Sequence, residues 1–170
     1  MVFRESEAKS LHDSGVMVKH NGEVPNKGIA RMFEAGLGDG YELKCLYRSP
    51  GPDGFSLGYA WFKSNYALPP HTHNADCLYY VVAGEVHFGI QVLTAGDGLF
   101  IPADAPYTYS VGAQGAEILE FRDSSQFDIT VKAGTDQGWD RLASICAANK
   151  EQWKRESPPV RVAKVASILK

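Results

Sequence analysis

The residues best suited to chemistry in this chain are His71 and His73, followed closely by Cys77. Side chains alternate between the two faces of a β-strand, so a His-x-His pair on a strand presents both imidazoles on one face. Neutral imidazoles are common ligands of transition metals and common acid–base groups. The spacing therefore predicts a functional site around His71 and His73.

The elements that must position these residues are short strands. Residues 41–132 are dense in β-branched and aromatic side chains, and Pro/Gly turn signals divide them, as at 49–54 and 102–106. Short strands at such spacing are typical of an all-β sandwich or barrel. We expect eight strands, at 41–48, 56–63, 77–82, 86–92, 99–102, 107–111, 117–122 and 127–132.

Four of these strands are expected to form two hairpins. Strands 41–48 and 56–63 lie on either side of a Pro/Gly-rich turn. Strands 77–82 and 86–92 are separated by Gly84, which can adopt the backbone angles of a tight turn. The His-x-His pair would then enter the sheet just before the second hairpin.

The chain falls into three parts around this β-rich region. Residues 1–40 mix charge with glycine and are expected to form an N-terminal extension, followed by the barrel at 41–132. Apolar residues recur at helical spacing over 136–155, which predicts an amphipathic helix within the C-terminal helix and tail at 133–170. Residues 160–169 alternate apolar and basic side chains, as in a terminal strand or a segment docked on another subunit.

Two motifs of the β-rich region resemble those of the cupin superfamily. The first runs from His71 through His73 and Cys77 to Gly84, and the second covers residues 96–106. The resemblance implies an all-β fold, the cupin-type double-stranded β-helix (jelly-roll barrel). The N-terminal extension and the C-terminal helix would be additions to this barrel.

The resemblance covers roughly residues 60–122 and also implies a ligand set. Cupins offer two His and a Glu from the first motif and a further His from the second. Here the Glu position is Cys77 and the second-motif His position is Tyr107. The implied cofactor is a divalent transition metal (Fe, Ni, Zn or Cu), with His71, His73, Cys77 and Tyr107 as candidate ligands. A degenerate cupin pocket without metal is the alternative.

Strand alternation also predicts an aromatic pocket. Tyr79 shares the face of Cys77, and Tyr109 shares the face of Tyr107. Mostly apolar walls with a few convergent polar groups describe a typical small-molecule site. The candidate substrate-binding residues are Tyr79, Tyr109, Phe100 and Trp61. Alternatively, these rings simply fill a small barrel.

Two classes of function fit these features. The first is a metal-dependent dioxygenase acting on a small keto, phenolic or acid compound, with Tyr107 as the catalytic acid or base or as a third metal ligand. The second is a non-catalytic metabolite-binding or sensor protein that lacks a complete metal site. Glu117 and Glu120 fall on opposite faces of their predicted strand, so one of them is expected to reach the pocket.

The composition narrows the partners. With 17 Lys and Arg against 20 Asp and Glu, the formal charge is −3, which disfavours nucleic acid as a partner. No apolar run approaches the ~20 residues of a membrane span, and no hydrophobic secretory signal is present, so we expect a cytoplasmic protein. The three cysteines do not form a disulfide framework. We expect a homodimer, because an exposed sheet edge invites pairing.

Overall fold

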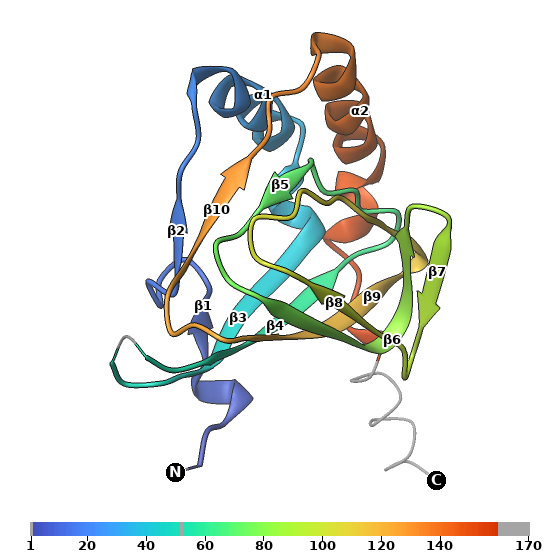
Figure 1. Cartoon of the computed structure of the whole chain (residues 1–170). Coiled ribbons are helices and arrows are strands. Elements are labelled where there is room, and N and C mark those ends of the chain that lie inside the picture. The colour runs from blue at the N-terminus through green and yellow to red at the C-terminus, as the bar shows by residue number, and fades with distance from the viewer. Residues whose placement is uncertain (1, 52, 160–170) are drawn as a thin grey trace, which may run out of the picture.

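Two β-sheets face each other and enclose the interior of the protein (Figure 1). The computed structural model describes residues 2–51 and 53–159. Its strands are β1 (Lys9–Ser10), β2 (Met17–Lys19), β3 (Tyr41–Arg48), β4 (Ser56–Phe62), β5 (His71–Thr72), β6 (Cys77–Phe88), β7 (Gln91–Thr94), β8 (Gly98–Ile101), β9 (Ser110–Arg122) and β10 (Phe127–Val131). Its helices are α1 (Glu23–Glu34) and α2 (Asp136–Trp153), with 3₁₀ turns at Glu5–Glu7 and Leu37–Gly40.

The larger sheet has the strand order β1-β3-β4-β9-β6-β7, and β8 also pairs with β6. The smaller sheet has the order β2-β10-β5. An isolated bridge between His71 and Tyr107 connects the start of β5 to the segment that leads into β9. His71 therefore lies in the smaller sheet, and His73 follows directly after β5.

The first expected hairpin is confirmed, since β3 and β4 pair antiparallel. The second is wrong: β6 runs unbroken through Gly84, and the turn into β7 comes later, at Gly89. Gly84 has a φ of 77°, and the register with β9 shifts next to it, so its left-handed backbone forms a bulge rather than a turn.

β9 also differs from expectation because a glycine with a left-handed backbone lies within a continuous strand. Separate strands at 107–111 and 117–122 were expected, but β9 is one strand, and Gly115 within it has a φ of 69°. A Cβ atom at Gly84 would lie 1.9 Å from the carbonyl oxygen of Gly115. The two glycines thus allow a close approach of two long bulged strands, and this bends the larger sheet.

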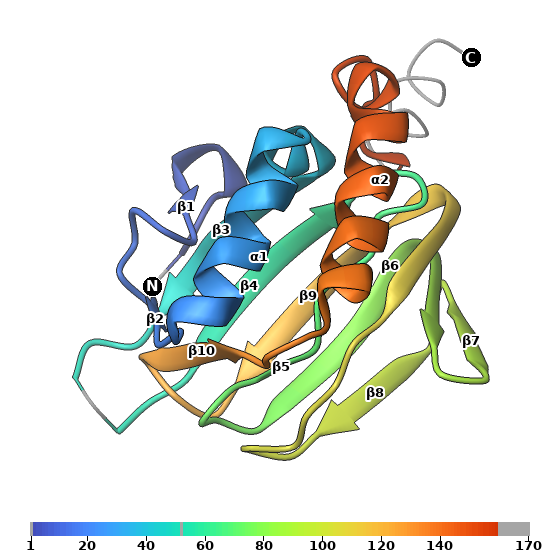
Figure 2. The ribbon, with the colours of Figure 1, turned by 90° about the horizontal axis from the view of Figure 1, so that it is seen from above.

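Both helices lie side by side at the top of the molecule in Figure 1, and Figure 2 shows them from above. α2 matches the expected helix at 136–155. α1 was not expected in the N-terminal extension, because a proline and a glycine interrupt its sequence. Pro25 lies in the first turn, where proline is tolerated, and Gly28 packs on the ring of Trp139.

The main core lies between the sheets and beneath the helices. It contains Met32 of α1, Ile118 of β9 and Trp153 of α2, all buried. The segment at 160–169, expected to be a strand or a docked segment, lies outside the described residues. Among the described helices, none is long and apolar enough to span a bilayer.

Candidate functional site

A cavity of about 520 Å³ opens between α1, the N-terminal segment and the two sheets. Its walls are mostly apolar and include Ile29 and Met32 from α1, Leu43 from β3, and Ile129 and Val131 from β10. A volume of this size is typical of small-molecule sites. The cavity lies between α1 on one side and residues of β3 and β10 on the other.

A smaller chamber of about 70 Å³ adjoins the cavity further inside. Leu43, Leu68, His71 and Ile129 are among the residues that line both spaces. The polar residues of this inner chamber are His71, His73, Tyr59, Tyr79, Tyr109, Glu120 and Arg122. An apolar cavity thus adjoins a chamber that is also mostly apolar but contains several buried polar groups.

Both histidines are buried and held by backbone carbonyls. Nδ1 of His71 donates to the carbonyl oxygen of Pro69 at 2.8 Å, and Nδ1 of His73 donates to that of Asp128. Because carbonyl oxygens only accept, each ring carries its proton on Nδ1 and leaves a lone pair on Nε2. Burial, together with the charge of Arg122, lowers the pKa of His71 to about 4 and that of His73 to about 2. Both imidazoles are therefore neutral at pH 7.

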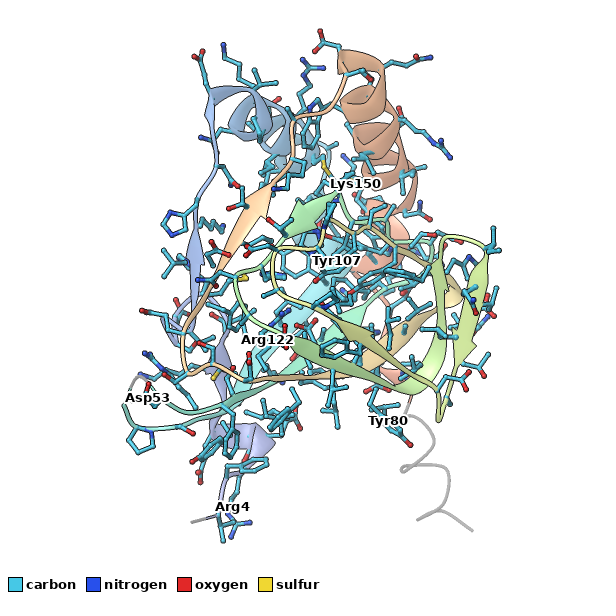
Figure 3. The ribbon with its side chains drawn as sticks, in the orientation of Figure 1. Arg4, Asp53, Tyr80, Tyr107, Arg122 and Lys150 are labelled. Carbon is cyan, nitrogen blue, oxygen red and sulfur yellow. The ribbon has the colours of Figure 1, made fainter. Side chains whose placement is uncertain are left out.

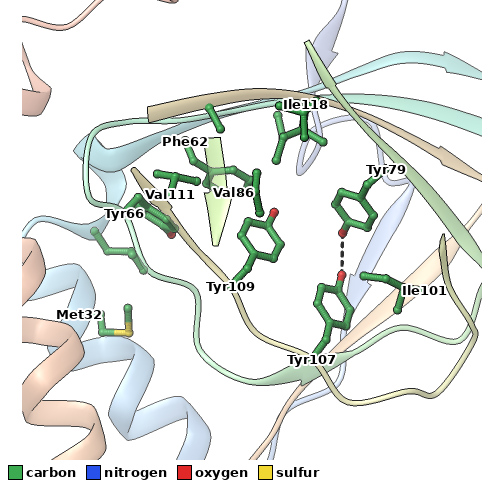
Figure 4. Packing of buried hydrophobic residues seen from close by; sticks show 14 of the residues in the cluster. Met32, Phe62, Tyr66, Tyr79, Val86, Ile101, Tyr107, Tyr109, Val111 and Ile118 are labelled. Atoms are coloured by element: carbon green, nitrogen blue, oxygen red, sulfur yellow. Dashed lines mark hydrogen bonds between the residues drawn. The ribbon is translucent and has the colours of Figure 1, made fainter. Parts of the chain in front are cut away.

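A buried ion pair on β9 connects to a pair of tyrosines. Nη2 of Arg122 lies 3.0 Å from Oε2 of Glu120 and donates to the hydroxyl of Tyr79 at 3.3 Å. The hydroxyls of Tyr79 and Tyr107 lie 2.7 Å apart, as the dashed line in Figure 4 shows. Burial raises the pKa of both phenols well above its usual value, so they remain protonated. The guanidinium also lies over the ring of Phe127, 4.3 Å from its centroid.

Two buried polar atoms at this site have no hydrogen-bond partner among the described residues. They are Nε of Arg122 and the hydroxyl of Tyr109. Arg122 is 2% exposed and Tyr109 is 5% exposed, and both line the inner chamber. Buried donors are normally paired, so each of these two atoms is a candidate partner for a ligand atom in the chamber.

The structure brings together some of the residues expected at the site and separates others. His71, His73, Tyr79 and Tyr109 line the inner chamber, while Tyr107 lies behind it, hydrogen-bonded to Tyr79. Figure 3 shows Tyr107 near the middle of the molecule, between the sheets.

Phe100 and Trp61 do not point into the interior, contrary to expectation. Phe100 pairs with the exposed Leu78 and is itself 54% exposed, on the outer face of the larger sheet. Trp61 lies between Ala60 and Phe62, whose side chains point inward, so its own ring lies on the opposite face of β4, where it is buried, with Nζ of Lys63 4.9 Å from its centroid. A substrate-binding role is not proposed for either residue.

The sequence reasoning missed Arg122. Along β9, Ile118, Glu120 and Arg122 point inward, because they pair with the buried residues Val81, Tyr79 and Cys77 of β6. Of the two glutamates weighed above, Glu120 is thus the one that reaches the chamber. The signal was a pair of opposite charges two residues apart, in phase with the buried isoleucine.

A metal ion needs more donors than the site provides. The anchored imidazoles offer two Nε2 atoms, as second-shell hydrogen bonds do in metal sites. Within the described ranges, however, no three His, Cys, Asp or Glu side chains lie close enough to share an ion. Burial raises the pKa of the Cys77 thiol, which disfavours the thiolate that binds metals. The residues present therefore do not fit a metal held by three protein ligands.

Comparisons with known proteins bear on the fold. No family model matches the chain, and no curated protein matches it. Among solved structures, it is similar to an RmlC-like cupin from Shewanella frigidimarina, with 26% sequence identity and a TM-score of 0.46. The match covers 52% of this chain and 79% of that chain. It is also similar to the polyketide cyclase RemF from Streptomyces resistomycificus, with 19% identity, coverage of 64% and 82%, and a TM-score of 0.51.

The second likeness concerns the fold alone. It agrees with the two facing sheets. The chain has the fold of the cupin superfamily.

Proposed function

We propose that this protein binds a small organic molecule between its two sheets. The observation that carries the proposal is the junction of two spaces, an apolar cavity of about 520 Å³ and a chamber of about 70 Å³ that contains the buried polar groups of Arg122 and Tyr109. The apolar part of the ligand would occupy the cavity, against Leu43, Met32 and Ile129. Its polar group would enter the chamber, near Tyr109 and Arg122.

The buried polar groups of the chamber favour a bound ligand over simple packing of the interior. Burying a charged guanidinium and several phenols is unfavourable unless each donor is paired. Arg122 and Tyr109 each keep a donor without a partner among the described residues. A ligand with an acceptor group would satisfy them, whereas an apolar core at the same place would need neither residue.

Tyr107 takes a positioning role in this proposal. It does not line either space, and its hydroxyl holds that of Tyr79, which does line the chamber. A raised phenol pKa also makes it a poor base at neutral pH. We therefore assign Tyr107 to the support of the binding site instead of to acid–base catalysis.

A metal-dependent dioxygenase is the second candidate function. One observation favours it: both imidazoles keep a free lone pair on Nε2, oriented by backbone carbonyls. It ranks second because the third ligand is missing. Metal analysis, described in the Discussion, separates the two candidates.

The proposal is tested by filling the cavity. Leu43→Trp places a large ring where β3 borders both spaces, and Leu78→Trp makes the same change on the exposed outer face of β6. A panel of bicyclic aromatic compounds is screened against both variants and the parent protein by ligand-observed NMR. Binding that is lost in Leu43→Trp and kept in Leu78→Trp supports the proposal. Binding that survives in both variants places the ligand elsewhere and contradicts it.

A further inference from the structure

The inner chamber already balances its own charge. Arg122 carries the positive charge, and Glu120, 3.0 Å away on the same strand, carries the negative one. Both side chains are largely buried, with 3% and 13% of their surface exposed. A ligand that brought a further charge into this chamber would leave that charge without a partner, which is costly in a buried site.

The other polar atoms of the chamber also disfavour an anion. Nδ1 of His71 and Nδ1 of His73 both donate to backbone carbonyls, so the atoms that remain on these rings are acceptors. Glu120 adds a further acceptor. A carboxylate in the chamber would face these acceptors with lone pairs of its own.

Two fully buried donors of the chamber are candidates for an acceptor group of the ligand. They are Nε–H of Arg122 and O–H of Tyr109, which lack partners within the described part of the chain. Nη2 of Arg122 is engaged, because it donates to Glu120 and to the hydroxyl of Tyr79. One carbonyl oxygen, with two lone pairs and no net charge, matches this supply.

We infer that the ligand presents an uncharged carbonyl group, as in a ketone, aldehyde, ester or amide, to Arg122 and Tyr109 in preference to a carboxylate. The inference rests on the proposed function and adds the chemical class of the ligand. It assigns Glu120 as a specificity-determining residue, since its charge is what excludes acids. It assigns Tyr109 as a direct contact of the carbonyl oxygen.

The test uses three probes of one shape: naphthalene, 2-acetonaphthone and 2-naphthoate. The ketone is expected to bind at least about tenfold more tightly than the carboxylate, because a buried unpaired charge costs more than a lost hydrogen bond. In Glu120→Gln, which keeps an acceptor for Arg122 and removes the negative charge, the carboxylate is expected to gain about tenfold and the preference to narrow or reverse. Glu34→Gln, an exposed change on α1, should leave the ratio unchanged.

A second variant keeps the test decisive if Glu120→Gln does not fold. Tyr109→Phe should weaken the ketone by about tenfold and leave naphthalene unchanged, because only the ketone uses the hydroxyl. Tyr80→Phe, on the exposed outer face of β6, is its control.

The outcomes distinguish a failure of the carbonyl preference from a failure of the proposed small-molecule binding. A parent protein that prefers 2-naphthoate, or a Glu120→Gln variant with an unchanged ratio, overturns the inference while the proposed function stands. If none of the three probes binds to the parent protein, the inference falls together with the proposed function.

Discussion

Cys77 and Arg122 lie directly opposite each other on the neighbouring strands β6 and β9, and both side chains point into the interior. The resemblance to cupins implies that Cys77 lies at the position of a glutamate ligand and Tyr107 at that of a histidine ligand. In the structure the residue opposite Cys77 is a positively charged arginine, whose charge is balanced by Glu120.

The first prediction concerns metal content. The purified protein is expected to hold much less than one equivalent of iron, nickel, copper or zinc, because two neutral imidazoles without an anionic ligand bind weakly. Elemental analysis after purification without chelators or a histidine tag measures this. The double variant Cys77→Glu/Tyr107→His, which restores the cupin ligand types, is expected to bind Zn²⁺ or Ni²⁺ at least about tenfold more tightly in calorimetry.

The control for this experiment is His71→Ala/His73→Ala. If the parent protein contains a stoichiometric metal and this variant loses it, the dioxygenase becomes the better supported function and metal-free ligand binding is wrong. Circular dichroism on each variant shows whether a loss of metal reflects a loss of fold.

The second prediction concerns stability and pH. The folded-state pKa of His71, about 4, and that of His73, about 2, lie below the ordinary value near 6.5. The unfolded chain therefore binds more protons below pH 6.5, and stability falls as the pH is lowered through the window from 6.5 toward 4. Each imidazole contributes up to about 1.4 kcal/mol per pH unit to this loss.

Urea unfolding at pH 7 and at pH 5 measures the loss. His73→Asn, which cannot take up a proton, should lose about 2 kcal/mol less than the parent protein over that interval. His87→Asn, which changes a more exposed imidazole on β6, is the matched control. Equal slopes for the parent and His73→Asn would show that this ring is not held neutral by burial.

The third prediction concerns the bulge in the larger sheet. Gly84→Ala would place a Cβ atom 1.9 Å from the carbonyl oxygen of Gly115 at a φ of 77°, so the two long strands would have to separate. We expect a loss of about 3 kcal/mol or more in the free energy of unfolding. Gly89→Ala has a φ of 61° but nothing within 4 Å of its Cβ, and should cost only about 1 kcal/mol. Similar losses in the two variants would mean that the close approach of the strands is not what matters.

The fourth prediction concerns association. The outer face of the larger sheet carries a continuous row of large side chains exposed by 41% to 54%: Phe3, Phe55, Leu78, Tyr80, Phe100 and Phe121. Leu78 pairs with both Phe100 and Phe121, and the Phe55 and Phe121 rings lie 5.2 Å apart. Taking roughly 200 Å² per large side chain, half-exposed, this row offers about 600 Å² per protomer. Stable interfaces bury about 800 Å² on each side.

We propose that a second copy of the chain covers this face, since such an apolar row is complementary to itself across a two-fold axis. Light scattering at micromolar concentration should give about twice the 18.6 kDa of one chain. Leu78→Asp/Phe121→Asp should give a monomer, while Val24→Asp, an equally exposed apolar position on α1, should not. A monomeric parent protein would contradict the proposal.

The sequence predicted the fold well where local patterns act alone. Alternation predicted inward-facing Tyr79 and Tyr109, and both side chains are buried and line the inner chamber. Gly84 was misread because a glycine with a positive φ serves a turn and a bulge equally well, and only the partner strand decides between them.

The site was less predictable because its charges come from another strand. Arg122 meets Tyr79 through strand pairing that brings β9 beside β6, and no local motif indicates that pairing. Phe100 was misplaced because its strand was assigned without knowing which face of β8 turns inward. α1 was missed because tertiary packing on Trp139 outweighs the low helix propensity of Gly28.

The contact between Gly28 and Trp139 also fixes the position of α1 over the cavity. A Cβ atom at Gly28 would lie 2.1 Å from the ring of Trp139, so the two helices meet with no room to spare. On the same helix, Asn26, Ile29 and Met32 form part of the cavity wall. A methyl group added at residue 28 would push α1 away from Trp139 and so move this wall of the cavity. A substitution at residue 28, which does not itself line the cavity, is thus one route by which evolution can change the size of ligand that the cavity accepts.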